Sequence, residues 1–261
     1  MVDLGFTMAH LESFLLIFIR MSGLFILSPI FGRNNLPAVF KIGFSFFLSV
    51  ILINAIEVPI VNMSGSIALY VLYVLKELVV GLVIGYATYV IMSAIYLAGQ
   101  LIDTQIGFGS VNVLDATSNI QVPLTSNFYY MYIILIFLTI NGHFFIIQAL
   151  FRSFEIIPIN TLGFNVNFVA DVIDIMREMF EIAIRIAAPI IATVFIADVV
   201  LGVLSRTIPQ MNVFQLGMPL KIIVGLLVIA ITFYYGNGVT EGITELMNKY
   251  MLQFLTRMGV T

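Results

Sequence analysis

The chain has 261 residues, of which 61% are hydrophobic and 10% are charged, with a formal net charge of −3 and no cysteine. The sequence contains long apolar runs that exceed what the core of a soluble domain of this size needs, which excludes an ordinary soluble domain. The absence of cysteine excludes a disulfide scaffold and a thiolate metal site. The small net charge, without a basic cluster, argues against a nucleic-acid partner.

Six apolar segments are long enough to be membrane helices, because about 20 helical residues cross the roughly 30 Å hydrocarbon layer. We therefore predict an all-α integral membrane protein that forms one membrane-embedded domain over residues 1–261. Unbroken runs such as FYYMYIILIFLTI lack the alternation of a membrane β-barrel. The predicted segments cover residues 11–31, 42–60, 67–98, 127–150, 179–204 and 219–236.

The third segment carries both glycines and charges. Gly81 and Gly85 are four residues apart, so they share one helix face and predict close packing against another helix, within the chain or in a partner. Lys76 and Glu77 are neighbours in an apolar environment. Their side chains are not expected to face each other, so each needs a partner elsewhere.

Residues 99–127 form a polar stretch between the third and fourth segments, with glycines, amides and hydroxyls interleaved with apolar residues. A loop of this kind cannot be exposed to lipid at membrane depth, because its backbone groups would lack partners. The residues alone leave two interpretations open. The stretch is either an ordinary loop at the membrane surface or a glycine-hinged loop with apolar tips that plugs a cavity.

Polar residues and one proline mark the later segments. Glu181 and Arg185 are four apart and can pair on one helix, whereas Asp198 needs a partner on another segment or chain. Asp198 is then either one member of a structural ion pair or a proton-coupling group. Pro189 is expected to kink or interrupt its helix. His143 is interpreted as a hydrogen-bonded structural residue rather than a ligand.

The tail predicts an amphipathic helix over about 239–258. Because it has few basic residues, we expect the helix to dock on protein, within the chain or in a partner, rather than on a lipid surface. Its apolar face consists of Val239, Ile243, Leu246, Met247, Tyr250, Met251, Phe254, Leu255 and Met258.

The chain lacks the sequence motifs of zinc hydrolases, serine hydrolases and phosphate-binding loops. We therefore expect a protein that is not an enzyme and has no cofactor or metal.

Five stretches, in order and at similar spacing, resemble the FliR family of flagellar export-gate proteins, which is related to the SctT proteins of injectisomes. The resemblance covers nearly the whole chain. The stretches are SPIFGRNNLPAVFKIGFSFFLS (28–49), KELVVGLVIGYA (76–87), AGQLIDTQIGFGSVNVLD (98–115), FLTINGHFFII (137–147) and SRTIPQMNVFQLGMPLKIIVGLL (205–227).

The resemblance implies a non-enzymatic subunit of the flagellar type III secretion export gate, at the flagellar basal body in the bacterial inner membrane. It implies one copy of this chain assembled with several FliP-like and FliQ-like subunits, and association with an FlhB-like protein. Unfolded flagellar proteins would pass through the centre. It also implies bent helical hairpins in an assembly raised partly out of the bilayer, so that hydropathy finds the helices but misplaces them relative to lipid.

The family's channel plug follows its third hydrophobic segment. The resemblance assigns that role here to Gly107, Phe108, Gly109, Val111, Val113, Leu114 and Asp115, with the four apolar side chains as the seal. Many relatives have Asp-Pro where this chain has Asp115-Ala116, which puts the stiffness of the loop in doubt.

The sequence does not decide the role of the charged residues in the apolar segments, nor does it decide between several competing functions. The residues Lys76, Glu77, Arg185 and Asp198 are expected to hold subunits in register, with proton coupling as the alternative. Competing functions are a small secondary transporter with Asp198 or Glu77 in its coupling site, an injectisome gate subunit, and an assembly factor that does not line the pore.

Overall fold

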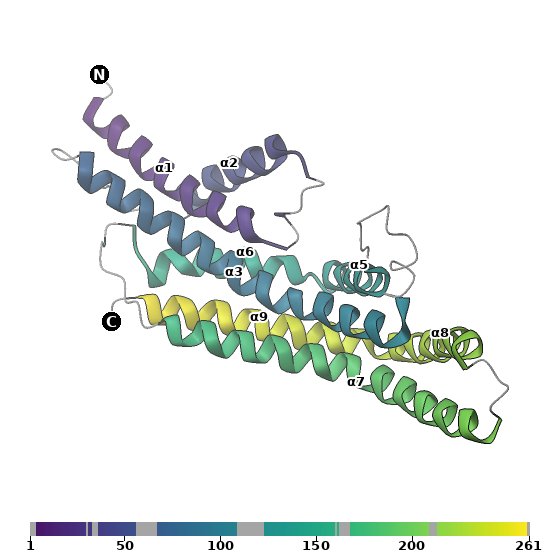
Figure 1. The fold of residues 1–261 in the computed structure, drawn as a ribbon. Coiled ribbons are helices and arrows are strands. Elements are labelled where there is room, and N and C mark those ends of the chain that lie inside the picture. Colours follow the sequence, from purple (N-terminus) through teal and green to yellow (C-terminus); the bar gives the residue numbers. More distant parts are fainter. Residues whose placement is uncertain are drawn as a thin grey trace. The chain divides into compact units, whose positions relative to one another are not determined.

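The computed structural model describes residues 4–29, 31–32, 36–55, 67–108, 123–159, 161, 168–208 and 213–259. Within these ranges every regular element is a helix, which confirms the prediction of an all-α protein (Figure 1). The elements are α1 (Leu4–Leu27), α2 (Ala38–Ala55), α3 (Ile67–Ile106), α5 (Leu124–Thr139), α6 (Gly142–Ile156), α7 (Val169–Thr207), α8 (Val213–Thr232), the 3-10 turn η3 (Phe233–Tyr235) and α9 (Gly236–Met258).

The described part of the chain contains four helical stretches long and apolar enough to cross a membrane, or five if the bent pair of α5 and α6 counts as one span. The four are Ala38–Ala55, Ile67–Ile106, Val169–Thr207 and Gln215–Met258. The predicted segment 219–236 is thus part of a longer stretch that includes the tail. It was predicted separately because the polar residues after position 236 lower the local hydropathy.

The predicted segment 127–150 is not one helix. Its two parts, α5 and α6, are bent by 70°. Asn141, at the start of α6, has a φ of 59°, a left-handed conformation that asparagine tolerates better than most other residues. Hydropathy misses this bend because apolar residues continue on both sides of it.

The interruption considered at Pro189 does not occur, because α7 runs as one helix from Val169 to Thr207. Proline has no N–H group to donate to the Arg185 carbonyl, but the helix continues on both sides of this position. The hydroxyl of Thr193 donates to the Pro189 carbonyl at 2.7 Å, which gives this oxygen a local partner.

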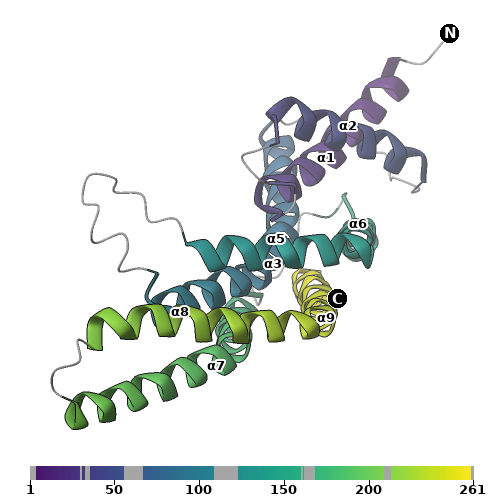
Figure 2. The same cartoon turned by 90° about the vertical axis from the view of Figure 1, so that its right-hand side faces the viewer.

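The chain forms two compact units, and α3, α7 and α9 pass through both. Unit 1 contains Met1–Val90, Asn141–Ile175 and Thr244–Thr261. Within it α2 folds back on α1, where edge-on contacts join Phe14 to Phe46 and Phe25 to Phe44 with ring centroids 5.3 and 5.4 Å apart. Unit 2 contains Ile91–Ile140 and Met176–Ile243. In it the second half of α7 lies beside α8 (Figure 2).

The tail helix α9 buries its apolar face inside the protein. In unit 1, Met247, Tyr250, Met251 and Phe254 are almost inaccessible to solvent. The ring of Phe168, just before α7, packs edge-on against Phe254. Docking within the chain, one of the two modes expected for the tail, is therefore the one observed for these residues.

By contrast, α8 leaves large apolar side chains uncovered. Ile223, Leu227 and Ile231 are 60%, 61% and 65% exposed. They recur every four residues and so form a stripe along one side of the helix. Such a surface requires lipid or another protein to cover it.

Candidate functional site

Three charged side chains are buried together in unit 1, where α1 and α3 meet the end of α6. Arg20 and Glu77 are fully buried and Lys76 nearly so. Arg20 Nε donates to Glu77 Oε2 at 2.5 Å, and Lys76 Nζ lies 2.8 Å from Glu77 Oε1. The expectation that Lys76 and Glu77 would not face each other is wrong, because the flexible lysine stem lets its ammonium reach the neighbouring carboxylate.

The guanidinium of Arg20 ties α1 to the last turn of α6. Its Nη1 donates to Ser153 Oγ at 3.0 Å, and its Nη2 donates to the Ile157 carbonyl at 2.8 Å. The guanidinium carbon also lies 4.0 Å from the centre of the Phe154 ring. A charge at this depth is tolerated because ionic, polar and aromatic partners surround it.

Lys76 binds the backbone that follows α6. Its ammonium donates to the carbonyls of Pro158, Ile159 and Thr161 at 2.9, 3.2 and 2.8 Å. Backbone carbonyl oxygens are strong hydrogen-bond acceptors that carry partial negative charge. They offset the excess of two cations over one carboxylate. The buried charge cluster, as we call Arg20, Lys76 and Glu77, therefore acts as a structural joint.

Glycines let α1 and α3 approach closely beside this cluster. A Cβ atom on Gly81 would lie 2.1 Å from the Arg20 backbone oxygen, and one on Gly85 would lie 2.9 Å from the Leu24 oxygen. From the other helix, a Cβ atom on Gly23 would lie 3.2 Å from the Gly81 Cα atom. The two glycines singled out in the sequence therefore pack inside the chain against α1, and Gly81 lies there beside Gly23.

Two of the residues assigned to a channel plug lie at the end of α3. Gly107 has a φ of 97°, and its N–H donates to the Asp103 carbonyl at 3.1 Å. Phe108 is half-buried. Glycine ends a helix in this way because the left-handed conformation strains other residues. The other assigned residues, Gly109, Val111, Val113, Leu114 and Asp115, lie outside the described residues.

Asp103 is a further functional candidate that the sequence did not single out. Its carboxylate is buried and lies close to the first turn of α5, with Oδ1 and Oδ2 3.0 and 3.2 Å from the Thr125 backbone nitrogen. A weak signal was present in the sequence, because α5 begins after Pro123 and has no side-chain cap of its own.

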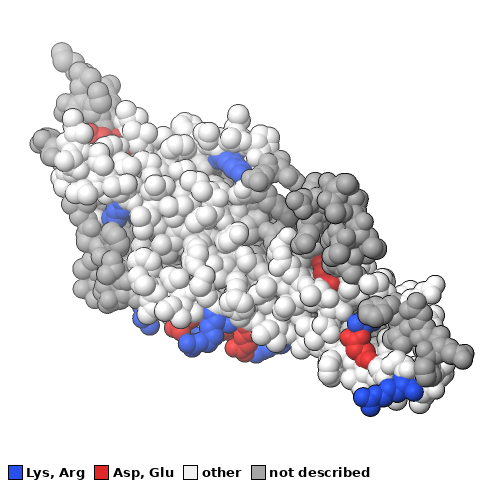
Figure 3. All heavy atoms as spheres, in the orientation of Figure 1, with Lys and Arg blue, Asp and Glu red and all other residues white. Residues whose placement is uncertain are grey.

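Both of the later predicted charges form ion pairs in unit 2. Arg185 Nη2 lies 2.7 Å from Glu181 Oε1, and this pair is exposed. Asp198 pairs with Lys221 of α8, which is a partner on another segment as expected. Figure 3 shows positive and negative side chains close together along the edge formed by α7, whereas the charges on the other described surface in this view are few and scattered.

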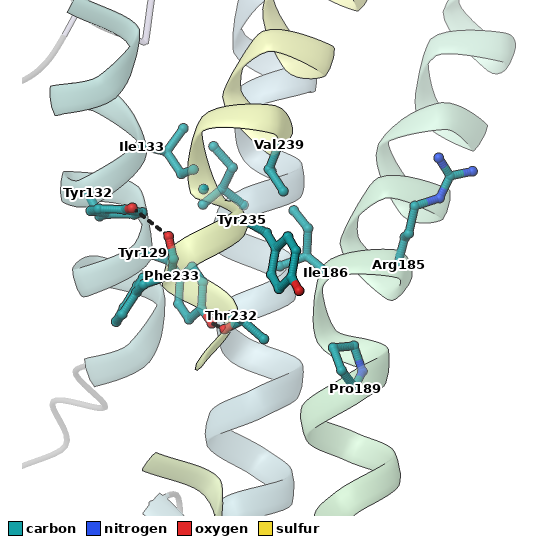
Figure 4. Close-up of a pocket in the computed structure, with 12 residues that line it drawn as sticks. Tyr129, Tyr132, Ile133, Arg185, Ile186, Pro189, Thr232, Phe233, Tyr235 and Val239 are labelled. Carbon is teal, nitrogen blue, oxygen red and sulfur yellow. Dashed lines mark hydrogen bonds between the residues drawn. The ribbon is translucent and has the colours of Figure 1, made fainter. Parts of the chain in front are cut away.

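Unit 2 also contains a cavity of about 180 Å³. Aromatic side chains from α5 and η3 line it, and Tyr132 Oη donates to the Phe233 carbonyl at 2.8 Å (Figure 4). Arg185 lies at its edge, apart from the rings. This lining offers no acid–base pair, so the cavity has the composition of an apolar binding or packing space.

The hydrogen bonding expected of His143 is not seen at one of its two ring nitrogens. Its Nδ1 atom is buried and has no hydrogen-bond partner among the described residues. The ring instead stacks at a tilt on Phe144, with centroids 4.4 Å apart.

Residues 11–247 match the family described as bacterial export proteins, family 1. The chain belongs to this family. It is 35% identical over 255 residues to the flagellar biosynthetic protein FliR of Bacillus subtilis, covering 95% of this chain and 96% of that protein. The corresponding protein of Aquifex aeolicus is 30% identical over 224 residues, 85% of each chain. The resemblance to FliR proteins is confirmed.

A protein named for a secretion system apparatus is also similar to this family 1 export protein. The secretion system apparatus protein SsaT of Salmonella typhimurium is 31% identical over 160 residues, 61% of this chain and 62% of that protein. The match to the family spans the buried charge cluster, the end of α3 and the ion pairs of α7 and α8. These features therefore lie within the family's own domain.

Proposed function

We propose that this chain is a non-enzymatic subunit of a type III protein export gate that serves the flagellum in the bacterial inner membrane. The observation that carries the proposal is the family match over residues 11–247, together with similarity to a flagellar biosynthetic protein along almost the whole chain. The helices that could span a membrane support a membrane location.

The uncovered surface of unit 2 supports assembly with other chains. The Asp198–Lys221 pair remains partly exposed between helices whose apolar side chains are uncovered. Lipid is a poor neighbour for such a pair, whereas the polar groups of a partner helix can satisfy it. We infer that one copy of this chain assembles with several FliP-like and FliQ-like subunits and contacts an FlhB-like protein. In this assembly Arg185 and Asp198 would hold subunits in register, while Lys76 and Glu77 stabilise the chain itself.

The segment Gly107–Asp115 is proposed to plug the channel through which unfolded flagellar proteins pass. A soft apolar seal excludes water and ions when closed and deforms when a polypeptide enters. Its side chains would be Phe108, Val111, Val113 and Leu114. The left-handed Gly107 at the start of this segment is a suitable hinge.

The first experiment is to purify the tagged full-length chain from its own host in mild detergent and measure the native mass and composition. One copy bound to several FliP-like and FliQ-like chains is the expected result. A homo-oligomer or an isolated chain, under conditions that preserve other membrane complexes, would contradict the proposal and favour a small transporter.

Glycine replacement across Phe108–Leu114 tests the plug separately. The expected variant assembles normally but leaks ions. An assembly factor that does not line the pore would show no leak, and that outcome would remove the plug assignment while leaving gate membership intact.

Similarity to SsaT favours an injectisome gate as the second candidate function. Deletion of the gene and restoration of the full-length chain distinguish the two. A flagellar subunit is required for filaments and motility. A motile deletion strain that no longer secretes another set of proteins would support the injectisome instead.

A further inference from the structure

We propose that Asp103 is a positioning residue that joins the two ends of the segment 107–123 by capping α5 from α3. The importance of this joint for export rests on the function proposed above for that segment. The joint itself rests on contacts within unit 2 that involve described residues alone.

The first contact is the cap. The first N–H groups of a helix have no partner inside the helix, and the helix dipole places positive charge there. Pro123, the N-cap residue of α5, provides no side-chain hydrogen bond. Asp103, 22 residues earlier, fills that place, because both of its buried carboxylate oxygens lie within hydrogen-bond distance of the Thr125 N–H. The helix end stabilises the carboxylate, and the carboxylate satisfies the helix end.

The second contact lies one turn earlier on α3. A Cβ atom on Gly99 would lie 2.3 Å from the Ser126 Cα atom, so the two backbones touch and no larger residue fits. The Ser126 hydroxyl donates to the Tyr96 carbonyl at 3.0 Å. Positions 96, 99 and 103 follow helical spacing along one face. The first turn of α5 is therefore fastened to α3 at three successive levels.

The third contact holds the end of α3 from another side. A Cβ atom on Gly225 of α8 would lie 2.5 Å from Ile106 Cδ1, so this glycine leaves room for the last side chain of α3. Gly107 then leaves the helix with its left-handed φ. The point at which the chain departs from α3 is thus fixed by its neighbours.

Separation of α3 from α5 would leave a buried carboxylate and a helix N–H group without partners, which is costly away from water. The joint therefore resists separation of the end of α3 from the start of α5. In the proposed gate, a polypeptide would be admitted while α3 and α5 remain fastened.

The test exploits the fact that the chain has no cysteine. A full-length Asp103→Cys, Thr125→Cys variant is expressed in a deletion strain of its host, and its thiols are bridged in cells with a short bis-methanethiosulfonate. Loss of labelling by a maleimide polymer reports the bridge independently of export. Secretion of flagellar proteins and the amount of chain in the membrane are measured in parallel.

We expect Asp103→Cys alone to lower secretion by about threefold or more, because a charge-assisted hydrogen bond is lost. Bridging of the double variant should restore secretion, and a reducing agent should abolish the recovery. Asp103→Asn, which keeps an acceptor oxygen but loses the charge, should have an intermediate effect. The matched control pairs Thr125→Cys with Thr104→Cys, since Thr104 is exposed one residue away. It should bridge poorly and secrete normally.

Two results would overturn the proposal. Accessible thiols at 103 and 125 that fail to bridge would show that these positions are not adjacent. A bridge that forms but blocks secretion until it is reduced would show that the ends must separate. Failure of the proposed function gives a different pattern, in which the bridge forms readily but deletion of the whole gene leaves flagellar secretion unchanged.

Discussion

Replacing Glu77 with alanine removes the carboxylate that lies between Arg20 and Lys76 while both cations remain buried. Removing one partner of a buried ion pair typically costs about 3–5 kcal/mol, because an uncompensated charge is left away from water. The carbonyls around Lys76 offset part of this charge, so we expect a loss near the lower end of the range. A suitable control is Glu181→Ala, which breaks an exposed pair worth about 0.2–1 kcal/mol.

The free energy of unfolding can be measured by denaturant titration of the purified chain in mild detergent, with helical circular dichroism as the signal. Replacing Arg20, Lys76 and Glu77 together by Met, Met and Leu should destabilise less than Glu77→Ala, since charges and counter-charge disappear together. If Glu77→Ala unfolds at the same denaturant concentration as Glu181→Ala, the buried charge cluster does not depend on its carboxylate and the reasoning is refuted.

Three further changes can be measured, the first two by the same titration and the third by limited proteolysis. Gly81→Ala places a methyl group 2.1 Å from a backbone oxygen of α1 and should cost about 1–3 kcal/mol, whereas Gly43→Ala meets nothing within 4 Å and should be neutral or stabilise by about 0.4–1 kcal/mol. Equal effects of the two would contradict the close packing of α1 and α3. Tyr129→Phe deletes the 2.8 Å hydrogen bond to Thr232 and should cost about 1 kcal/mol; no change would show that the bond contributes nothing. Arg257→Ala removes the guanidinium 3.2 Å from a buried carboxylate on α7 and should make the end of α9 more sensitive to protease; unchanged protection would exclude this anchor.

The helices of this protein could be read from hydropathy, because long apolar runs have few alternatives in a membrane. The bend at Asn141 could not, since it depends on one left-handed residue inside a continuous apolar run. The continuity of α7 through Pro189 was equally hidden, because proline interrupts some helices and is accommodated in others.

The sequence indicated which charges need partners better than it indicated which partners they have. It identified Glu77 as requiring one elsewhere, and Arg20 proved to be that partner, 57 residues away. Residue spacing within one helix does not predict a contact between two helices. It also led us to underestimate how far the Lys76 side chain bends. Asp103 was missed for a related reason, since a residue that caps another helix carries no signal within its own.

The position of Arg20 also sets an order for synthesis and insertion. A buried guanidinium without its partners is costly, so α1 does not reach its observed packing while Arg20 is unpaired. Its hydrogen bond to the Ile157 carbonyl spans 137 residues, which a ribosome needs roughly 7 to 27 s to make. Arg20 on α1 therefore gains its partners in two steps, first Glu77 on α3 and then the end of α6, as each is synthesised. The final packing of α1 therefore follows the synthesis of α6, which comes later in the chain.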